Sequence, residues 1–341
     1  MTRILITGGA GFVGCNLAEY FLNKGCEVTV FDNLSRNGTE KNLEWLRSNH
    51  KTGFEFIKED IRKFNPLLDA VRDKNLIFHT AGQVAVTTSV KNPRDDFEIN
   101  VLGTFNVLEA ARKTNSNPIL IFTSTNKVYG NNVNKVPLIE KTMRYEFVDS
   151  SYKNGIPEDF STDADEHTPY GSSKYAADVY VRDFFNIYGL RTITFRMSCV
   201  YGTRQFGNED QGWVAYFTIS SFLNKPIVIY GDGKQVRDVL FIDDLVSAFE
   251  LAYRKIEKTK GKAYNIGGGV SNTISLLELI GLLKDLGLNP RYTFDDWRPA
   301  DQKVYISDIR KSAEFGWKPK TSPEEGVKKL LEWVKENKSI F

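Results

Sequence analysis

The chain has 341 residues, 41% of them hydrophobic and 26% charged, which is an ordinary composition for a globular protein of one or two domains. Its 45 basic and 43 acidic residues leave a formal charge of +2, so nothing in the overall charge favours nucleic acid or an anionic membrane as a partner. Three cysteines and three histidines stand in no metal-ligand spacing, which predicts reduced thiols and no metal site. No signal-peptide layout and no apolar stretch of roughly 18 residues occurs, so we expect a cytoplasmic protein.

Strand and helix patterns alternate through the first part of the chain. Apolar runs predict strands at 3–7, 27–32, 54–60, 75–82, 118–125 and 192–202, and helical spacing predicts helices that include 12–25 and 100–114. This alternation predicts an α/β fold with a Rossmann-type, doubly wound parallel sheet that is covered on both faces.

The pattern changes after residue 202, where the chain becomes irregular. A short helix is predicted at 212–224, a strand followed by a helix at 237–254, and a helix at 275–287. We therefore predict a large N-terminal lobe, residues 1–195 with a returning segment near 237–255, and a smaller C-terminal α/β lobe, residues 196–341. The first lobe is expected to bind a dinucleotide and the second mainly the substrate.

A glycine-rich turn follows the first predicted strand. Gly8, Gly11 and Gly14 stand where the strand gives way to a helix, and such a turn lets the main chain and the helix N-terminus approach a pyrophosphate. Asp32 ends the next strand, as expected for a carboxylate that binds the hydroxyl groups of a ribose. Because this carboxylate would repel a 2′-phosphate, the pattern predicts NAD as the cofactor, while Arg36 leaves some tolerance of NADP open.

Tyr170 and Lys174 are four residues apart in a helical pattern, so they share one face of the helix. An ammonium group beside a phenol stabilises the phenolate, and a phenolate can act as a general base toward a sugar hydroxyl. The spacing alone is common in helices, so the prediction depends on its combination with the glycine turn.

In their order and separation, the two motifs resemble the extended short-chain dehydrogenase/reductase family. The resemblance covers nearly the whole chain and includes the segments "FDNLSR", "EDIR", "HTAG", "NVLGTFNVLEAAR", "TSTNKVYG", "PYGSSK", "YGDGKQVRDVLFIDDL" and "YNIGGG". It implies a catalytic triad of Thr125, Tyr170 and Lys174. The NAD-binding residues that it implies are Gly8, Gly11, Phe12, Val13, Asp32, Asn33, Asp60, Ile61, Thr80, Ala81, Gly82, Gln83, Thr123, Tyr170 and Lys174.

The residues after Thr125 narrow the reaction that the resemblance implies. Nucleotide-sugar 4,6-dehydratases of the family carry Asp-Glu there to eliminate water, whereas this chain has Asn126 and Lys127. The string "STNKVYG" and the segments "HTPYGSSK" and "YGTRQFGNEDQGWVAYF" are most similar to the CDP-hexose 2-epimerases of the family. They imply inversion at C2 of a CDP-sugar through a transient 2-keto sugar. The expected substrate-binding residues are Thr125, Asn126, Lys127, Ser198, Arg204, Gln211, Trp213, Arg237 and Arg298.

Two other functions stay open at this point. One is 4-epimerisation, or another activity of the family, on a UDP- or GDP-sugar. The other is a non-enzymatic NAD-binding regulator, which the presence of Tyr170 and Lys174 disfavours. By analogy with the family we expect a homodimer or homotetramer, and His79, in an apolar strand, is expected to be a core residue and not a catalyst.

Overall fold

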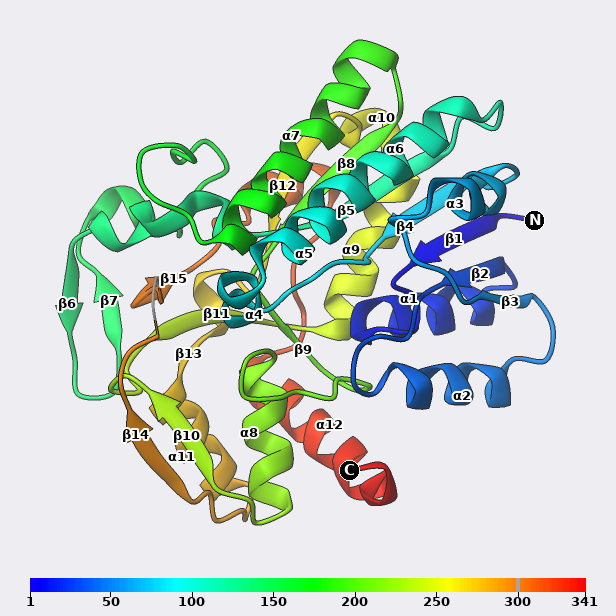
Figure 1. The fold of residues 1–341 in the computed structure, drawn as a ribbon. Helices are drawn as coiled ribbons and strands as arrows, with labels where there is room; N and C mark the ends of the chain where they lie inside the picture. Colours follow the sequence, from blue (N-terminus) through cyan, green and yellow to red (C-terminus); the bar gives the residue numbers. More distant parts are fainter. Residues whose placement is uncertain (299–300) are drawn as a thin grey trace. The chain divides into compact units, whose positions relative to one another are not determined.

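The computed structural model describes residues 1–298 and 301–341 (Figure 1). The chain divides into two compact units. The first comprises Met1–Thr125, Pro169–Arg196 and Val246–Tyr264, and the second comprises Asn126–Thr168, Met197–Leu245 and Asn265–Phe341.

The chain passes from the first unit to the second after Arg196, one residue beyond the predicted boundary, but the second unit also includes the earlier segment Asn126–Thr168. The long polar segment that follows Thr125 belongs to the second unit, because its main chain is bonded there. Tyr145 N donates a hydrogen bond to Lys234 O (3.0 Å), and Ile156 N donates one to Ile306 O (2.7 Å). The segment that returns to the first unit begins at Val246, nine residues later than the predicted start near 237.

A seven-stranded sheet, with the order β12-β8-β5-β4-β1-β2-β3, forms the centre of the first unit. The pairs from β5 to β3 are all parallel. The strands are β1 (Arg3–Thr7), β2 (Glu27–Phe31), β3 (Phe54–Ile57), β4 (Leu76–His79), β5 (Ile119–Thr125), β8 (Thr192–Met197) and β12 (Lys262–Ile266). Every residue of β5 is buried, as expected for a strand that helices cover on both faces. The α/β fold class with a parallel Rossmann-type sheet is therefore confirmed.

Helices cover the two faces of this sheet (Figure 1). On one face the apolar core joins side chains of the sheet to Leu67, Val107 and Val181. On the other face Phe21, Phe78 and Phe249 form successive aromatic contacts. The helices are α1 (Phe12–Asn23), α2 (Thr39–Asn49), α3 (Phe64–Val71), α4 (Val86–Lys91), α5 (Pro93–Phe97), α6 (Gly103–Lys113), α7 (Pro169–Tyr188), α9 (Ile242–Arg254) and α10 (Ile256–Thr259). A π-helical turn, η1 (Glu98–Leu102), precedes α6.

One predicted strand, 192–202, is wrong as a single element. β8 ends at Met197, and β9 (Cys199–Tyr201) pairs instead with β11 of the second unit. Ser198 lies at the break, where its N–H donates to Ile266 O (3.0 Å) and its hydroxyl donates to Asp238 Oδ1 (2.5 Å). The strand β12 was not predicted.

Small sheets and three helices make up the second unit. In one sheet β11 is the central strand and pairs with β9, β13 and β15. Two further sheets have two strands each: β10 pairs with β14, and β6 pairs with β7. The strands are β6 (Leu138–Glu140), β7 (Tyr145–Phe147), β10 (Ile227–Tyr230), β11 (Val236–Phe241), β13 (Thr273–Ser275), β14 (Tyr292–Asp295) and β15 (Val304–Tyr305). The helices are α8 (Trp213–Phe222), α11 (Leu276–Asp285) and α12 (Pro323–Glu336), and the 3₁₀ turns of the chain are η2 (Asn126–Lys135), η3 (Ser150–Tyr152), η4 (Val270–Asn272), η5 (Arg310–Phe315) and η6 (Lys338–Ile340).

Helix α11 begins at a reciprocal cap. Ser275 Oγ accepts a hydrogen bond from Glu278 N (3.1 Å), and the Glu278 carboxylate accepts one from Ser275 N (2.7 Å), so two main-chain N–H groups at the start of the helix are satisfied. None of the helices in the described part of the chain combines the length and the apolar character that a bilayer crossing requires.

Candidate active site

The glycine turn brings three segments of main chain into contact. Gly8 has a φ of +69°, and a Cβ on it would lie 2.6 Å from Ala81 N; a Cβ on Gly14 would lie 2.4 Å from Gly8 O. Gly11 caps α1 without a side-chain hydrogen bond, and Phe12 follows as the first helical residue. The main-chain N–H groups of a first helical turn have no partner within their own helix. A narrow turn of this kind fits a pyrophosphate.

The carboxylate of Asp32 lies directly beside this turn. Its Oδ2 accepts a hydrogen bond from Ala10 N (3.0 Å), and its Oδ1 accepts one from Leu34 N (2.8 Å). Burial raises the pKa of Asp32, against the effect of these main-chain bonds and of Arg36. An acid at the end of the second strand, held against the glycine turn, fits the hydroxyl groups of an adenosine ribose.

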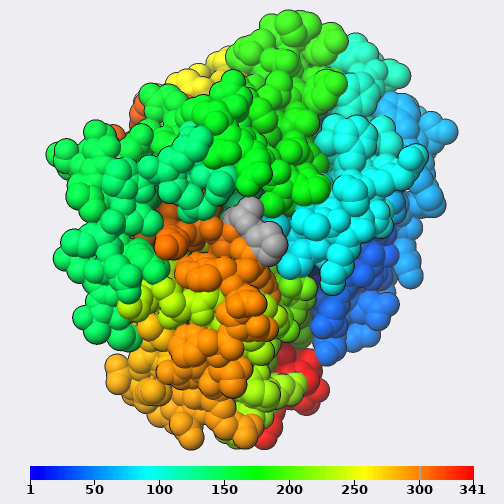
Figure 2. Space-filling model, turned by 60° about the vertical axis from the view of Figure 1, so that its left-hand side comes forward, coloured from blue at the N-terminus to red at the C-terminus, as the bar shows by residue number. Residues whose placement is uncertain are grey.

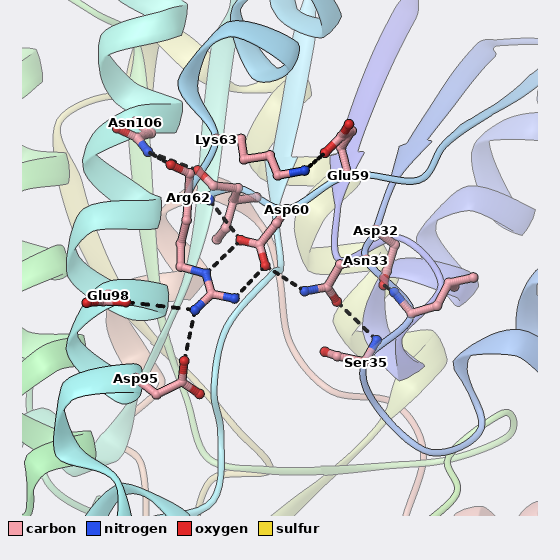
Figure 3. Close-up of polar contacts among 12 residues, drawn as sticks. Asp32, Asn33, Ser35, Glu59, Asp60, Arg62, Lys63, Asp95, Glu98 and Asn106 are labelled. Carbon is pink, nitrogen blue, oxygen red and sulfur yellow. Dashed lines mark hydrogen bonds and ion pairs between the residues drawn. The ribbon is translucent and has the colours of Figure 1, made fainter.

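A second acid, Asp60, is the centre of a polar network (Figure 3). Asn33 Nδ2 donates to Asp60 Oδ2 (2.9 Å), and the Arg62 guanidinium donates to both carboxylate oxygens, at 3.0 Å from Nε and 2.8 Å from Nη2. Arg62 also pairs with Asp95 at 2.8 Å and approaches Glu98 at 3.9 Å. Burial opposes ionisation of Asp60, but the bonds from Arg62 and Asn33 outweigh it and lower its pKa to about 2.

Arg62 was not among the predicted site residues, although it belongs to the quoted segment "EDIR". Arg62 joins the segment after β3 to the segment that contains Asp95. This contact links residues 33 positions apart, so no local sequence pattern predicts it. The side chain of Ile61, a predicted adenine contact, packs in the hydrophobic core of the first unit. Any contact of Ile61 with the cofactor must therefore use its main chain.

The segment after β4 lines the other side of the glycine turn. Thr80 Oγ1 donates to Thr7 O (2.7 Å), and Ala81 is the residue that Gly8 approaches. A Cβ on Gly82 would lie 3.0 Å from Asn100 Oδ1 and 3.8 Å from Lys174 Nζ. The tight packing at Gly8 and Gly82 connects the predicted cofactor site to the Tyr170–Lys174 helix.

The three hydroxyl groups at the end of β5 have different hydrogen-bond partners. Thr123 Oγ1 donates to His79 O (3.1 Å), and Ser124 Oγ donates to Asp178 Oδ2 (3.0 Å). Thr125 is hydrogen-bonded to the phenol of Tyr170. The predicted partner of the tyrosine is therefore in contact with it, and Ser124 is turned to a buried carboxylate instead.

Tyr170 and Lys174 both lie in α7 with little exposure, 8% and 4%. The Lys174 ammonium lies 4.2 Å from the centroid of the Phe122 ring. Burial raises the pKa of Tyr170 to about 12, while the hydrogen bond with Thr125 lowers it. Burial lowers the pKa of Lys174 to about 7, against the carboxylates of Asp96 and Asp178. Desolvation dominates in the protein alone, so the pKa of Tyr170 lies above its ordinary value despite the hydrogen bond with Thr125.

In the second unit, several of the predicted substrate-binding residues gather around Lys127. Burial lowers its pKa to about 8; Asp301 opposes this shift and Arg237 adds to it. Arg237 is 8% exposed and its Nη2 lies 2.7 Å from Asp301 Oδ1. Asn126 Nδ2 donates to Gln302 Oε1 (3.2 Å).

The other predicted substrate-binding residues have individual partners in the second unit. Trp213 Nε1 donates to Cys199 Sγ (3.5 Å), and Arg204 stacks over the ring of Trp333. The main-chain N–H of Gln211 is bonded to Asn208, and Arg298 lies 4.0 Å from the ring centroid of Tyr230 and donates to Glu209 O. Ser198 donates its hydroxyl to Asp238, as described above. Their contact with a substrate stays a prediction.

His79 is a core residue, as predicted. It is fully buried, its ring nitrogens lie 2.7 Å from Thr7 Oγ1 and 2.9 Å from Thr104 Oγ1, and burial lowers its pKa to about 3. Among the residues that the structure describes, no cluster of three or more potential metal ligands is found.

A Rossmann sheet with a glycine turn, an acid at the end of the second strand and a buried Thr–Tyr–Lys group is typical of a dinucleotide-dependent enzyme of the short-chain type. Comparison with known proteins places the chain more closely: residues 4–267 match the model of the NAD dependent epimerase/dehydratase family, and the chain belongs to that family.

Individual relatives agree with this assignment. The chain is 47% identical to the CDP-paratose 2-epimerase of Salmonella typhi, over 97% of this chain and 99% of that protein. The crystal structure of UDP-glucose 4-epimerase from Thermotoga maritima with UDP-glucose has 30% sequence identity and a TM-score of 0.82, covering 98% of this chain and 99% of that one. The NAD complex of the UDP-glucose 4-epimerase from Thermus thermophilus has 29% identity and a TM-score of 0.81, covering 98% and 100%. The chain is an NAD-dependent nucleotide-sugar epimerase.

Proposed function

We propose that the chain inverts C2 of a CDP-hexose of the CDP-paratose type. The observation that carries the proposal is the 47% identity to a CDP-paratose 2-epimerase along almost the whole chain, against 30% to a UDP-glucose 4-epimerase of the same fold. The residues after Thr125 support it as well. Asn126 and Lys127 stand where the dehydratases of the family carry two acids, so this chain has no acid–base pair there for the elimination of water.

NAD, when bound, would supply a reversible hydride acceptor for the sugar carbon. The chain's own residues manage the proton. The oxygen of Tyr170, as the phenolate, removes the proton from the sugar hydroxyl and later gives it back, and Thr125 fixes that oxygen through its hydrogen bond. Lys174 supplies a positive charge on the same helix face, which favours the phenolate. Asp32 and the glycine turn would hold the ribose and the pyrophosphate of the cofactor.

The diphosphate of the substrate requires cationic partners. Lys127 and Arg237 interact electrostatically in the second unit, with Asp301 as the acid that they share. A buried arginine can bind phosphate oxygens through two parallel N–H groups. We assign the nucleotide diphosphate to these two cations, and Arg298 stays a predicted substrate-binding residue.

The test is a product analysis. The NAD-loaded protein is incubated with CDP-, UDP- and GDP-hexoses in deuterated water, and NMR locates the carbon that is inverted. We expect inversion at C2 of the CDP-sugar with no deuterium at C2, because the hydride returns internally. Inversion at C4 of a UDP- or GDP-sugar would overturn the proposal in favour of a 4-epimerase.

A matched variant tests the catalytic assignment separately. Tyr170→Phe keeps the ring and removes the oxygen, so we expect turnover to fall by roughly 100-fold or more, with NAD still bound. Unchanged turnover in this variant would disprove the role of Tyr170. Absence of turnover in the native chain with all three sugars, together with tight NAD binding, would support the non-enzymatic regulator instead.

We also infer a homo-oligomer that uses the outer surfaces of α6 and α7. Phe105, Tyr180, Ile187 and Tyr188 are between 37% and 71% exposed, and the rings of Phe105 and Tyr180 form an edge contact at 5.7 Å. Light scattering after size exclusion tests this inference. We expect Phe105→Glu combined with Tyr180→Glu to yield a monomer, and a monomeric native chain would contradict it.

A further inference from the structure

Asp96, in the short helix α5, is a buried carboxylate that the mechanism has not used. The residue is 1% exposed. Its Oδ1 accepts hydrogen bonds from Gln83 Nε2 (2.7 Å) and Asn100 Nδ2 (3.2 Å), whereas its Oδ2 has no hydrogen-bond partner within residues 1–298 and 301–341. In Figure 2 the surface of the segment that contains α4 to α6, in cyan, adjoins that of α7, in green.

Hydrogen bonds connect Asp96 to the catalytic helix. Asn100, which Asp96 binds, also donates from Nδ2 to Ser173 Oγ (3.0 Å), and Ser173 Oγ donates to Tyr170 O (3.1 Å). Asn100 Oδ1 and Lys174 Nζ both flank the position of Gly82. Asp96 and the Lys174 ammonium therefore belong to one buried polar cluster. Asn100, in the π-helical turn, connects α5 to α7 through its bonds to Asp96 and Ser173.

We propose that Asp96 is a positioning residue whose negative charge keeps the Lys174 ammonium protonated in its buried site. An ammonium group that is removed from water loses its proton unless an opposite charge compensates. The inference rests on the Tyr–Lys chemistry of the proposed function, but it does not depend on which sugar is bound.

Asp178 is the other acid that acts on Lys174, and its charge is already balanced. Its carboxylate pairs with Arg182 Nε at 2.9 Å and with Arg196 Nε at 3.0 Å, and it also accepts a hydrogen bond from Ser124. Among the residues that the structure describes, Asp96 has no ion pair of this kind; its chain neighbour Asp95 is the residue that binds Arg62. Two arginines thus neutralise one acid, and Lys174 is left as the cation that Asp96 can neutralise.

The electrostatic directions agree with this arrangement. Burial lowers the pKa of Lys174 to about 7. The negative charges of Asp96 and Asp178 oppose this shift, and Asp96 has the larger effect. Burial raises the pKa of Asp96, while hydrogen bonding to Ser173 and Gln83 and the charge of Lys174 lower it, and Asp95 raises it. Asp96 also raises the pKa of Tyr170. Loss of the charge at Asp96 must therefore lower the pKa of Lys174.

The charge of Lys174 can be read directly, without any substrate. Protein labelled with ¹³C at the lysine Cε is titrated by NMR in the absence of NAD, and the Lys174 signal is assigned by its loss in Lys174→Met. We expect Asp96→Asn to lower the titration midpoint of Lys174 by about one pH unit or more. Asp95→Asn makes the same change of charge one residue away and should leave the midpoint in place. Equal midpoints for Asp96→Asn and the native chain would overturn the proposal.

Two further measurements keep the test decisive if Asp96→Asn does not fold. Asp96→Ser is a second neutral variant, and a folded Asp96→Ser protein must show the same lowered midpoint. In the native chain, the ¹³C signal of the Asp96 carboxyl must report an ionised group at neutral pH. A protonated Asp96 at neutral pH would refute the proposal, because a neutral acid cannot balance an ammonium. None of these readings depends on epimerase activity, so their failure is distinct from a failure of the proposed function.

Discussion

Replacing Asp60 with asparagine removes the charge at the centre of the network in Figure 3 and keeps the size of the side chain. In the folded chain the pKa of Asp60 is about 2, against an ordinary value of 3.8, because the hydrogen bonds from Arg62 and Asn33 outweigh burial. At about 1.4 kcal/mol for each pKa unit, the difference sets an upper value of about 2.5 kcal/mol on its contribution to the free energy of unfolding. Since the Arg62 side chain is 34% exposed, water reduces that contribution to about 1 kcal/mol at neutral pH.

The pH dependence of this contribution has a definite sign. A depressed pKa means that the stabilisation is complete above pH 3.8 and is lost as the pH falls toward 2. Thermal unfolding of the NAD-free protein measures it: we expect Asp60→Asn to lower the Tm by about 2 °C at neutral pH and by less at about pH 3. Glu59→Gln, which removes the acidic partner of the exposed Lys63 side chain, is the control and should change the Tm less. A neutral-pH Tm equal to that of the native chain, or a difference that does not shrink in acid, would refute the reasoning.

Three other predictions use different parts of the structure. Gly14→Ala puts a Cβ 2.4 Å from Gly8 O, so NAD affinity measured by calorimetry should fall at least about tenfold; Gly281→Ala, whose Cβ meets nothing within 4 Å, should leave it unchanged. Lys127 loses its proton as the pH rises through about 8, so calorimetric affinity for CDP should decline there, and Lys127→Gln should bind more weakly without that decline; equal slopes would contradict the assignment. His79 has a pKa of about 3 when folded and 6.5 when unperturbed, so stability to urea should fall below pH 6.5, and His79→Gln should show a smaller fall.

Much of the first unit was predictable because its strands are continuous apolar runs bounded by glycines and helical patterns. The glycine turn, Asp32 and the spacing of Tyr170 and Lys174 could be identified for the same reason, since each is a local pattern. The contact between Thr125 and Tyr170 joins residues 45 positions apart, and the sequence supplied it only through the family resemblance. The strand break at Ser198 was not predictable, because "TITFRMSCVYG" has no glycine or proline before its last residue and its division depends on two different pairing partners.

Asp96 shows a second kind of limit. The segment "NPRDDF" contains two adjacent acids in a helix of five residues, too short for a hydrophobic period to show which acid points inward. In the structure Asp95 is turned to Arg62, and Asp96 is buried. A periodicity argument assigns faces only over several helical turns, so the distinction between these two acids had to come from the placement of their side chains.

Burial excludes water from Tyr170 and Lys174, but it also opposes the ionisation that the proposed chemistry requires of each. It raises the pKa of Tyr170 to about 12 and lowers that of Lys174 to about 7, so desolvation disfavours the charged form of both groups. A phenolate beside an ammonium therefore needs help from charges that the two residues do not carry. Asp96 supports the ammonium, but it raises the pKa of the phenol, so it cannot also generate the base. The positive charge of Arg36 also lowers the pKa of the phenol, but burial outweighs it. The remaining requirement is a further positive charge near the phenol oxygen, which a bound oxidised nicotinamide would supply. On this argument Tyr170 becomes an effective base only when the cofactor is in place, and the chain without it should bind a nucleotide sugar with the Tyr170 phenol still protonated.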